Sequence, residues 1–255
     1  MDSMCDIKAM KATEIFGEWD ETILWSCLQG VMGDILVCQA AAAAWLGDFC
    51  LLAGEVNSIL LDDVKEHMKE RGQQYLILVP KNDDWADMIE NYFGDHAKKI
   101  SRYAIKKEKG IFDKERLQIA VNTISNEYML KKIEKKEYDA CLCESWCKDL
   151  VSNFQTYEQY EKLGLGYVVM ENDEIVAGAS SYSVYQGGLE IEIDTRNDHR
   201  RKGLAYACGA KLILECLERG IYPSWDAHNL ASVSLAEKLG YHLDYEYLTY
   251  EILLK

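Results

Sequence analysis

Proline is scarce in this chain, and other features that mark particular protein classes are missing. Only 2 of the 255 residues are proline, while 49% are hydrophobic, a composition that excludes collagen-like and low-complexity disordered chains. Basic residues are also few, because 28 Lys and Arg stand against 43 Asp and Glu and give a net charge of −15. Such a charge repels nucleic-acid phosphates and anionic lipids, so we expect neither nucleic acid nor a membrane as a partner.

The chain also lacks a long apolar run and the motifs of several enzyme and metal-binding classes. The Ala-rich stretch at residues 35–46 is too short to cross a bilayer, and no Gly-x-x-x-x-Gly-Lys-Ser/Thr sequence indicates an ATPase. Cys141, Cys143 and Cys147 have no second Cys pair or nearby His to complete a zinc set. We therefore expect no metal. The nine Cys and the absence of a secretory segment predict a cytoplasmic protein.

The length of 255 residues favours two unequal domains. Residues 60–71 carry apolar side chains at helical spacing, and the continuous apolar run at residues 75–79 is typical of a buried strand. This alternation predicts a smaller α/β domain at residues 1–112, without a catalytic motif, that is either a degenerate copy of the second domain or a cap that shapes the substrate site. The charged run at residues 106–114 predicts a linker, and the second domain is expected at residues 115–255.

The second domain should contain an antiparallel meander, because turn-forming clusters of hairpin length separate three apolar runs. The elements expected along it are a strand at 117–121, helices at 126–137, 145–154 and 157–163, and strands at 166–170, 175–184 and 189–195.

The last of these strands leads into a basic turn and then a helix that extends to Glu218. A helix that begins after a glycine-containing loop presents unpaired backbone N–H groups and the positive end of its dipole, a combination that binds phosphate. Gly203 lets the backbone approach a pyrophosphate closely, and Ala205 is small enough to avoid a clash. The three cations at residues 200–202 could be an ordinary charged helix start, but they oppose the dipole unless an anion binds there.

Two motifs at residues 200–241 carry a family resemblance. The Arg-x-x-Gly-x-Ala sequence at residues 200–205, directly after a strand, resembles the acetyl-CoA signature (Gln/Arg-x-x-Gly-x-Gly/Ala) of the GNAT N-acetyltransferase superfamily. Residues 224–227 follow as a strand, and residues 229–241 are similar to the superfamily's Asn-to-Gly-Phe/Tyr helix. The resemblance covers roughly residues 115–255. The Trp-Asp-Ala-x-Asn sequence and the long N-terminal extension further resemble the zwittermicin A resistance protein type.

The resemblance implies a fold of the α/β (α+β) class, with a mixed, mainly antiparallel sheet that is flanked by helices. This sheet would be splayed between the strand ending at Thr195 and a strand at residues 222–226, with acetyl-CoA in the splay. The residues that the resemblance assigns to the coenzyme are Ile193 and Thr195 beside the pantetheine arm, Arg200, Arg201, Lys202, Gly203, Leu204 and Ala205 at the pyrophosphate, and Asn229 and Ser232 close to the arm.

Acetyl transfer to an amine also needs a base, because an alkylammonium with a pKa of about 10 is mostly protonated at neutral pH. Glu190, Glu192 and Asp194 project from one face of their strand, since successive side chains alternate. These acids could accept the proton or bind the ammonium group, and we favour Glu192 as the base, with Glu190 as a second candidate. The alternative is that they form an ordinary solvated strand face.

The general acid is less well specified by the sequence. Many members of the superfamily carry a Tyr four residues after Ser232 to reprotonate the thiolate, but this position is Ala236 here. Tyr241, Ser232 or water could substitute, or the thiolate could leave unaided. His199 and His228 could relay protons, although histidines in loops are more often exposed bystanders.

We therefore expect an N-acetyltransferase that moves the acetyl group of acetyl-CoA to a primary amine of a small molecule by direct attack. The alternative is a catalytically inactive acyl-CoA-binding sensor or scaffold module. The sequence leaves open which amine is the substrate and whether the protein forms a homodimer.

Overall fold

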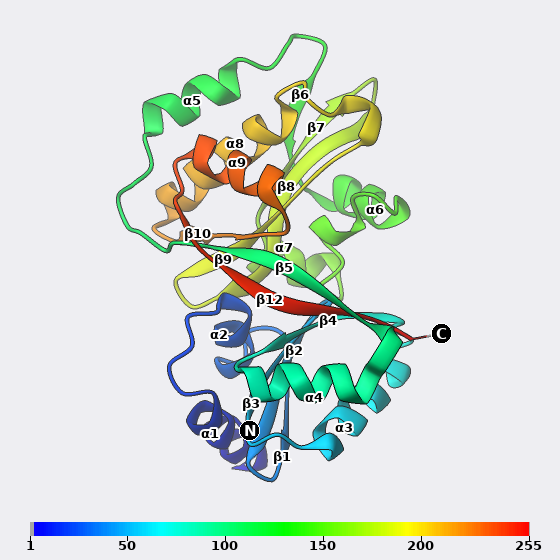
Figure 1. Cartoon of the computed structure of the whole chain (residues 1–255). Coiled ribbons are helices and arrows are strands. Elements are labelled where there is room, and N and C mark those ends of the chain that lie inside the picture. The colour runs from blue at the N-terminus through cyan, green and yellow to red at the C-terminus, as the bar shows by residue number, and fades with distance from the viewer. Residues whose placement is uncertain (1–2, 255) are drawn as a thin grey trace. The chain divides into compact units, whose positions relative to one another are not determined.

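The computed structural model describes residues 3–254, which form two compact units. The first unit comprises the chain up to Arg102 together with the part from Glu246 onward, and the second comprises Tyr103–Tyr245 (Figure 1). Compactness does not show that a unit folds alone, so the expected domains at residues 1–112 and 115–255 stay a prediction. No helix among the described residues combines the length and apolar character needed to span a bilayer.

The first unit is built on one sheet with helices packed against it. Its elements are α1 (Ser3–Phe16), α2 (Thr22–Leu28), β1 (Asp34–Cys38), β2 (Ala41–Leu46), β3 (Phe49–Gly54), α3 (Ser58–Glu70), β4 (Tyr75–Pro80), α4 (Asp83–Phe93), η1 (Gly94–His96), β5 (Ala97–Ile105) and β12 (Leu243–Leu253), of which β5 and β12 continue into the second unit. The strand order is β1-β2-β3-β4-β12-β5, with β3 and β4 parallel. Every residue of β2 is buried, which explains how an Ala-rich stretch becomes a strand despite its helix propensity.

The second unit has a five-stranded sheet in the order β10-β9-β8-β7-β6. Its elements are α5 (Lys114–Asn122), β6 (Met129–Lys132), α6 (Lys135–Cys143), η2 (Lys148–Leu150), α7 (Tyr157–Leu163), β7 (Gly166–Glu171), β8 (Glu174–Tyr185), β9 (Gly188–Thr195), η3 (Asn197–His199), α8 (Leu204–Arg219), β10 (Tyr222–Ser224), β11 (Asp226–Ala227) and α9 (Leu230–Leu239). Only the β9–β10 pair is parallel. The expected mixed, mainly antiparallel sheet flanked by helices is thus confirmed.

Three elements expected before the meander are wrong. The run at 117–121 lies in helix α5, because Asp113 caps the helix by accepting from the N–H of Arg116, and Leu117 and Ala120 at helical spacing are its buried residues. The stretch at 126–137, expected to be helical, contains strand β6, and that at 145–154 holds only the single turn η2. The segments from β7 to the end of α8 lie where the sequence predicts them.

Strand β10 and the chain after it separate from β9. The residues of β10 pair in parallel with Gly188–Glu190, but β11 pairs antiparallel with β5, at Tyr103 and Ala104. The single strand expected at residues 222–226 is therefore broken at Trp225, whose side chain is buried in the core. Beyond Glu190, β9 keeps its ladder with β8 and has no ladder partner on its other side among the described residues.

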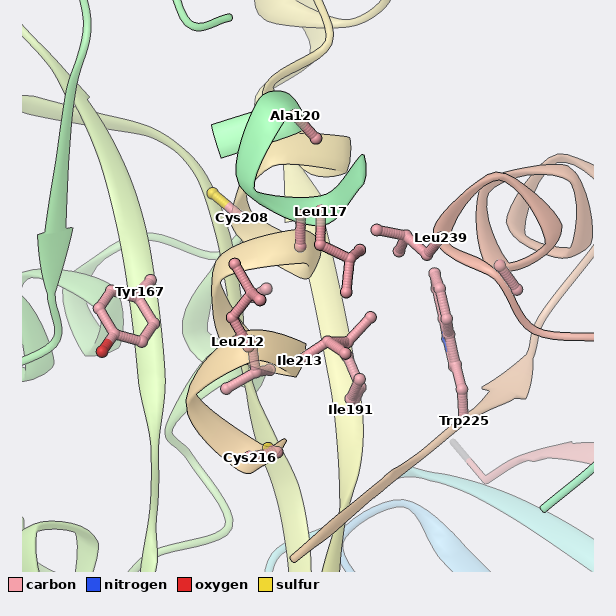
Figure 2. Close-up of a cluster of buried hydrophobic side chains, with 14 of the residues drawn as sticks. Leu117, Ala120, Tyr167, Ile191, Cys208, Leu212, Ile213, Cys216, Trp225 and Leu239 are labelled. Carbon is pink, nitrogen blue, oxygen red and sulfur yellow. The ribbon is translucent and has the colours of Figure 1, made fainter. Parts of the chain in front are cut away.

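Helix α8 packs tightly on β9. Its buried side chains, among them Cys208, Leu212 and Ile213, gather with Ile191 of β9 in one apolar cluster (Figure 2). The packing is close at Gly209, where an added Cβ would lie 2.9 Å from Leu239 Cδ1 and 3.1 Å from Ile193 Cδ1. This contact fixes the direction in which α8 leaves the end of β9.

We expect Gly209→Leu to lower the free energy of unfolding by about 1 to 3 kcal/mol, because the larger side chain overfills the contact between α8, β9 and α9. Urea unfolding followed by circular dichroism measures the loss. Glu218→Leu, which adds the same side chain at an exposed position of the same helix, is the control and should leave the midpoint nearly unchanged. Equal stability of the two variants would contradict the close packing at Gly209.

Candidate active site at the end of strand β9

The turn between β9 and α8 exposes backbone donors and cations together. Gly203 is the N-cap of α8 and has no side chain to cap it, so the first N–H groups of the helix have no acceptor within the helix. Gly203 has a φ of +82° and Arg201 a φ of +65°, and both values lie in the left-handed region that residues other than glycine rarely adopt. The residues expected to bind the pyrophosphate are consecutive in this turn and the start of α8. Arg200, Arg201, Lys202 and Gly203 are exposed, Leu204 is buried and Ala205 is half-buried.

The free side of β9 leads up to this turn. Ile193 packs against the core around α8, and both Ile193 and Thr195 are half-buried. The hydroxyl oxygen of Thr195 is buried and has no hydrogen-bond partner among the described residues. Because a buried hydroxyl without a partner costs free energy, this position suits a ligand that supplies a donor or acceptor. Thr195 and the exposed N–H groups fit an extended, polar ligand ending in phosphate.

The acidic residues of β9 lie on the opposite face of the strand. Ile191 and Ile193 belong to the core around α8, so the alternating side chains of Glu190, Glu192 and Asp194 point to the other side of the sheet. Glu190 is buried, at 6% exposure, whereas Glu192 and Asp194 are half-buried. The face is thus partly enclosed rather than the open, solvated strand face that was the alternative.

Asp194 has an electrostatic environment that the sequence does not reveal. Burial and the negative charge of Asp149 in η2 raise its pKa to about 6, while Arg200 acts in the opposite direction. A carboxyl group that titrates near neutrality can take up and release a proton at the pH of the cell. Sequence reasoning missed Asp149, because it lies 45 residues before Asp194 in an irregular segment that carries no motif.

Tyr241 lies in the core of the second unit. It is 1% exposed, its hydroxyl donates to the carbonyl oxygen of Pro223 at 2.6 Å, and its ring packs edge-on against Phe112 and Trp225. Burial raises the pKa of Tyr241 well above its usual value. These contacts brace β10 from the side away from β9, and Trp225 packs in the same core.

The residues expected near the coenzyme arm lie at the start of α9. Asn229 caps the helix, since its side-chain oxygen accepts from the N–H of Ser232 at 3.0 Å. Asn229 is exposed and Ser232 half-buried, while Ala236 lies buried one turn further along. Among residues 3–254 no cluster of His, Cys, Asp and Glu is arranged to hold a metal ion.

Of the two histidines near the loops, His228 agrees with the sequence-based expectation and His199 does not. His228 is exposed, but His199 is buried at 5% exposure and contacts Glu171 and Asp198. The interpretation of His199 as an exposed bystander is therefore wrong.

The geometry of β9, its turn and α8 agrees with a match to a known family. The family model of the GNAT acetyltransferases matches residues 13–250. The chain belongs to the GNAT acetyltransferase family. The match extends over parts of both compact units, whereas the two sequence motifs that resemble GNAT motifs, at residues 200–241, lie in the second unit.

Solved structures include other GNAT proteins that are similar to this one. A GCN5-related N-acetyltransferase-like protein from Streptococcus suis 89/1591 is 44% identical and superposes with a TM-score of 0.91 over 97% of this chain and 99% of that one. A GCN5-related N-acetyltransferase from Kribbella flavida, at 13% identity, has a TM-score of 0.59 over 99% and 96% of the two chains, which shows a shared fold.

A relative among curated proteins is the uncharacterized N-acetyltransferase YdfB of Bacillus subtilis strain 168. It is 26% identical over 177 residues, which are 68% of this chain and 64% of that protein, less than two thirds of its length. None of these three relatives is described as a zwittermicin A resistance protein, so that narrower resemblance stays a prediction.

The raised pKa of Asp194 predicts a pH-dependent effect of removing its charge. Its pKa in the folded protein, about 6, exceeds the ordinary 3.8, so the fold favours the protonated form and loses stability as the pH rises from about 4 through about 6. Asp194→Asn, which resembles the protonated form, should raise the free energy of unfolding by about 1 to 3 kcal/mol at pH 8 and much less at pH 4. Urea unfolding at both pH values measures this, with the exposed Asp244→Asn as the control. A gain that does not depend on pH would contradict the shift.

Proposed function

We propose that this GNAT protein is an acyl-CoA-dependent N-acyltransferase that moves the acetyl group of acetyl-CoA to a primary amine of a small molecule. The observation that carries the proposal is the separation of β10 from β9 directly before a helix start with uncapped N–H groups. A strand edge with free backbone groups suits the amide-containing arm of coenzyme A, and the helix start suits its pyrophosphate.

Each end of this coenzyme site has its own residues in the proposal. Backbone groups near Ile193 and Thr195 pair with the pantetheine arm, and the buried hydroxyl of Thr195 finds a partner there. Asn229 and Ser232 lie close to the same arm. The pyrophosphate accepts hydrogen bonds from the N–H groups of residues 201–205, and the side chains of residues 200–202 supply positive charge in a protein whose net charge is −15.

The reaction follows from the chemistry of a thioester and an amine. A base on the acidic face of β9 removes a proton from the acceptor's ammonium group, because only the neutral amine has a free electron pair. The amine nitrogen then attacks the thioester carbonyl and gives up its second proton to solvent water, so that a C–N bond of a neutral amide forms as the C–S bond breaks. The sulfur leaves with the bonding pair as a thiolate and takes a proton from Ser232 or water, since Ala236 offers no hydroxyl and the hydroxyl of Tyr241 is bonded to the backbone.

The acidic face provides both the base and the attraction for the acceptor. Glu192 remains the favoured base because it is half-buried in the middle of the face, while Glu190 is more deeply buried. Asp194, with its pKa of about 6, is the alternative base. Whichever group accepts the proton, the remaining carboxylates attract a positively charged amine.

The test of this function is a thiol-release assay with acetyl-CoA across a panel of small primary amines, run beside thermal unfolding with and without coenzyme. Amine-dependent release of free thiol supports the enzyme. Stabilisation by coenzyme A without turnover for any amine would instead favour the alternative, an inactive acyl-CoA-binding module. Neither turnover nor stabilisation would overturn both.

Gly203→Val should lower the affinity for coenzyme A by at least about tenfold, or about 1.4 kcal/mol. A β-branched side chain at a φ of +82° forces the backbone out of the conformation that exposes the N–H groups. Gly187→Val is a matched control, because Gly187 also has a positive φ and open surroundings but lies in the turn before β9. Calorimetric titration of both variants measures the difference, and equal affinities would count against this loop as the pyrophosphate site.

Glu192→Gln should lower kcat by about 100-fold or more while sparing the affinity for coenzyme A, because the amide cannot accept the proton. The thiol-release assay gives the rate, and calorimetry gives the affinity. Asp194→Asn tests the alternative base in the same assay, and Glu218→Gln on the exposed side of α8 is the control. If Glu192→Gln keeps the parent's rate and pH profile, the base is elsewhere.

A further inference from the structure

The side chain of Tyr128 lies against the turn that leads into helix α8, although it precedes Lys202 by 74 residues in sequence. Its hydroxyl oxygen accepts a hydrogen bond from Nζ of Lys202 at 3.1 Å, and the same ammonium lies 5.8 Å from the centroid of its ring. The ring also packs edge-on against the imidazole of His199, with ring centroids 6.2 Å apart. Tyr128 therefore contacts the first and the last residue of the segment 199–202.

Tyr128 is itself fixed by the second unit. Its backbone N–H donates to the carbonyl oxygen of Ser125 at 2.9 Å, and the next residue, Met129, begins β6 and pairs with Met170 of β7. The residue is half-buried, and its ring packs against the apolar core around α8. The ring is thus a fixed support for its hydroxyl group.

The hydrogen bond between Lys202 and Tyr128 leaves donor groups of both partners available. An ammonium group has three N–H donors, and Lys202 forms no ion pair with a carboxylate in the described part of the chain. A tyrosine hydroxyl that accepts one hydrogen bond can still donate its own hydrogen, and no described residue accepts the hydrogen of Tyr128. The pair therefore presents N–H and O–H donors from adjacent atoms, directly before the start of α8.

Such a pair suits a phosphate oxygen, which carries negative charge and accepts hydrogen bonds. The positive charge of Lys202 polarises the hydroxyl of Tyr128 and makes it a stronger donor to an anion. An exposed lysine loses rotamer freedom when it binds a ligand, but the contact with Tyr128 orders the ammonium group of Lys202 before a ligand arrives. Both effects raise the affinity of this turn for phosphate.

A second Tyr–Lys pair, in the middle of α8, shows the opposite arrangement. Nζ of Lys211 lies 5.1 Å from the ring centroid of Tyr167, but it also pairs with Glu215 at 3.6 Å. The hydroxyl of Tyr167 donates to the same carboxylate at 2.8 Å. The donors of this pair are therefore used within the protein, whereas those of Tyr128 and Lys202 are left for a ligand.

We propose that Tyr128 is a coenzyme-binding residue, whose hydroxyl donates to the pyrophosphate of coenzyme A beside Lys202. Its ring supports the turn, and its hydroxyl oxygen orients the ammonium group of Lys202 toward the same phosphate. This inference rests on the proposed function. It adds to the consecutive residues 200–205 a binding group from the segment between α5 and β6, where the sequence carries no motif.

The test is calorimetric titration of the full chain with coenzyme A. Tyr128→Phe keeps the ring and removes the hydroxyl, so the affinity should fall by about tenfold or more, because a hydrogen bond to a charged group is lost. The urea midpoint of this variant should equal that of wild type, since the ring still packs. Tyr167→Phe is the matched control, because it removes the hydroxyl of the pair whose donors are already used, and it should bind coenzyme A as wild type does.

A double-mutant cycle shows whether the two side chains act on one phosphate. Lys202→Met removes the ammonium group, keeps an unbranched side chain and should also lower the affinity by about tenfold or more. The double variant should lose less than the product of the two single losses, because each group is weakened when its partner is absent. The loss in Tyr128→Phe should be the same with 3′-dephospho-coenzyme A, which keeps the pyrophosphate but lacks the 3′-phosphate.

Four results would overturn the inference and leave the proposed function intact. They are unchanged affinity of Tyr128→Phe, a loss accompanied by a lower urea midpoint, single losses that simply multiply in the double variant, and a loss that disappears with 3′-dephospho-coenzyme A. If Tyr128→Phe does not fold, Tyr128→Met, which keeps an apolar side chain, takes its place under the same criteria. A wild-type protein that binds no coenzyme A would overturn the proposed function and this inference together.

Discussion

The parting of β9 and β10 after Glu190 is the constraint on which the rest of the site depends. A parallel ladder that continued to Thr195 would occupy the backbone groups of β9 and leave no free edge. The buried ring of Trp225 turns the chain away, and β11 completes the separation by pairing with β5. Tyr241 holds β10 in place through the hydrogen bond from its hydroxyl to the carbonyl oxygen of Pro223. The open edge is thus maintained by core packing, while β7 and β8 each pair with a neighbouring strand on both sides.

Much of the fold from β7 to α9 could be predicted from the sequence because the signals there are local. Turn residues such as Asn172 and Asp173, alternating strand residues, and the caps at Gly203 and Asn229 each specify a structure within a few positions. The region from residue 114 to residue 154 was predicted poorly for the opposite reason. Its elements are short, and the apolar run at residues 117–121 does not by itself distinguish a helix from a strand, although the N-cap at Asp113 is a local helix signal.

The candidate site, like the fold, could be predicted only where its signals are local in sequence. The loop at residues 200–205 could be found because its chemistry comes from consecutive residues, whereas the partners that tune it are distant in sequence. Asp149 reaches Asp194 from η2, and Glu171 reaches His199 from β7. Neither carboxylate carries a motif, and each acquires its role only when the sheet brings the two segments together. Tyr241 illustrates the reverse case, a residue in a recognisable motif whose hydroxyl is used by the fold.

The two faces of β9 also differ in their chemistry. Toward α8 lie apolar side chains and the N–H donors of the helix start, which suit an anionic coenzyme; on the other face lie carboxylates, which suit a cationic acceptor and of which Asp194 also interacts with Arg200. Because a single strand carries both sets, its pleat keeps each ligand's charges on its own side and lets the two meet only at the strand's free edge. Because a net charge of −15 would repel coenzyme A, the proposed site depends on the local cations at residues 200–202. Nearby acids such as Glu171 and Asp198 are paired with His199 and Arg196, which reduces the negative charge close to these cations.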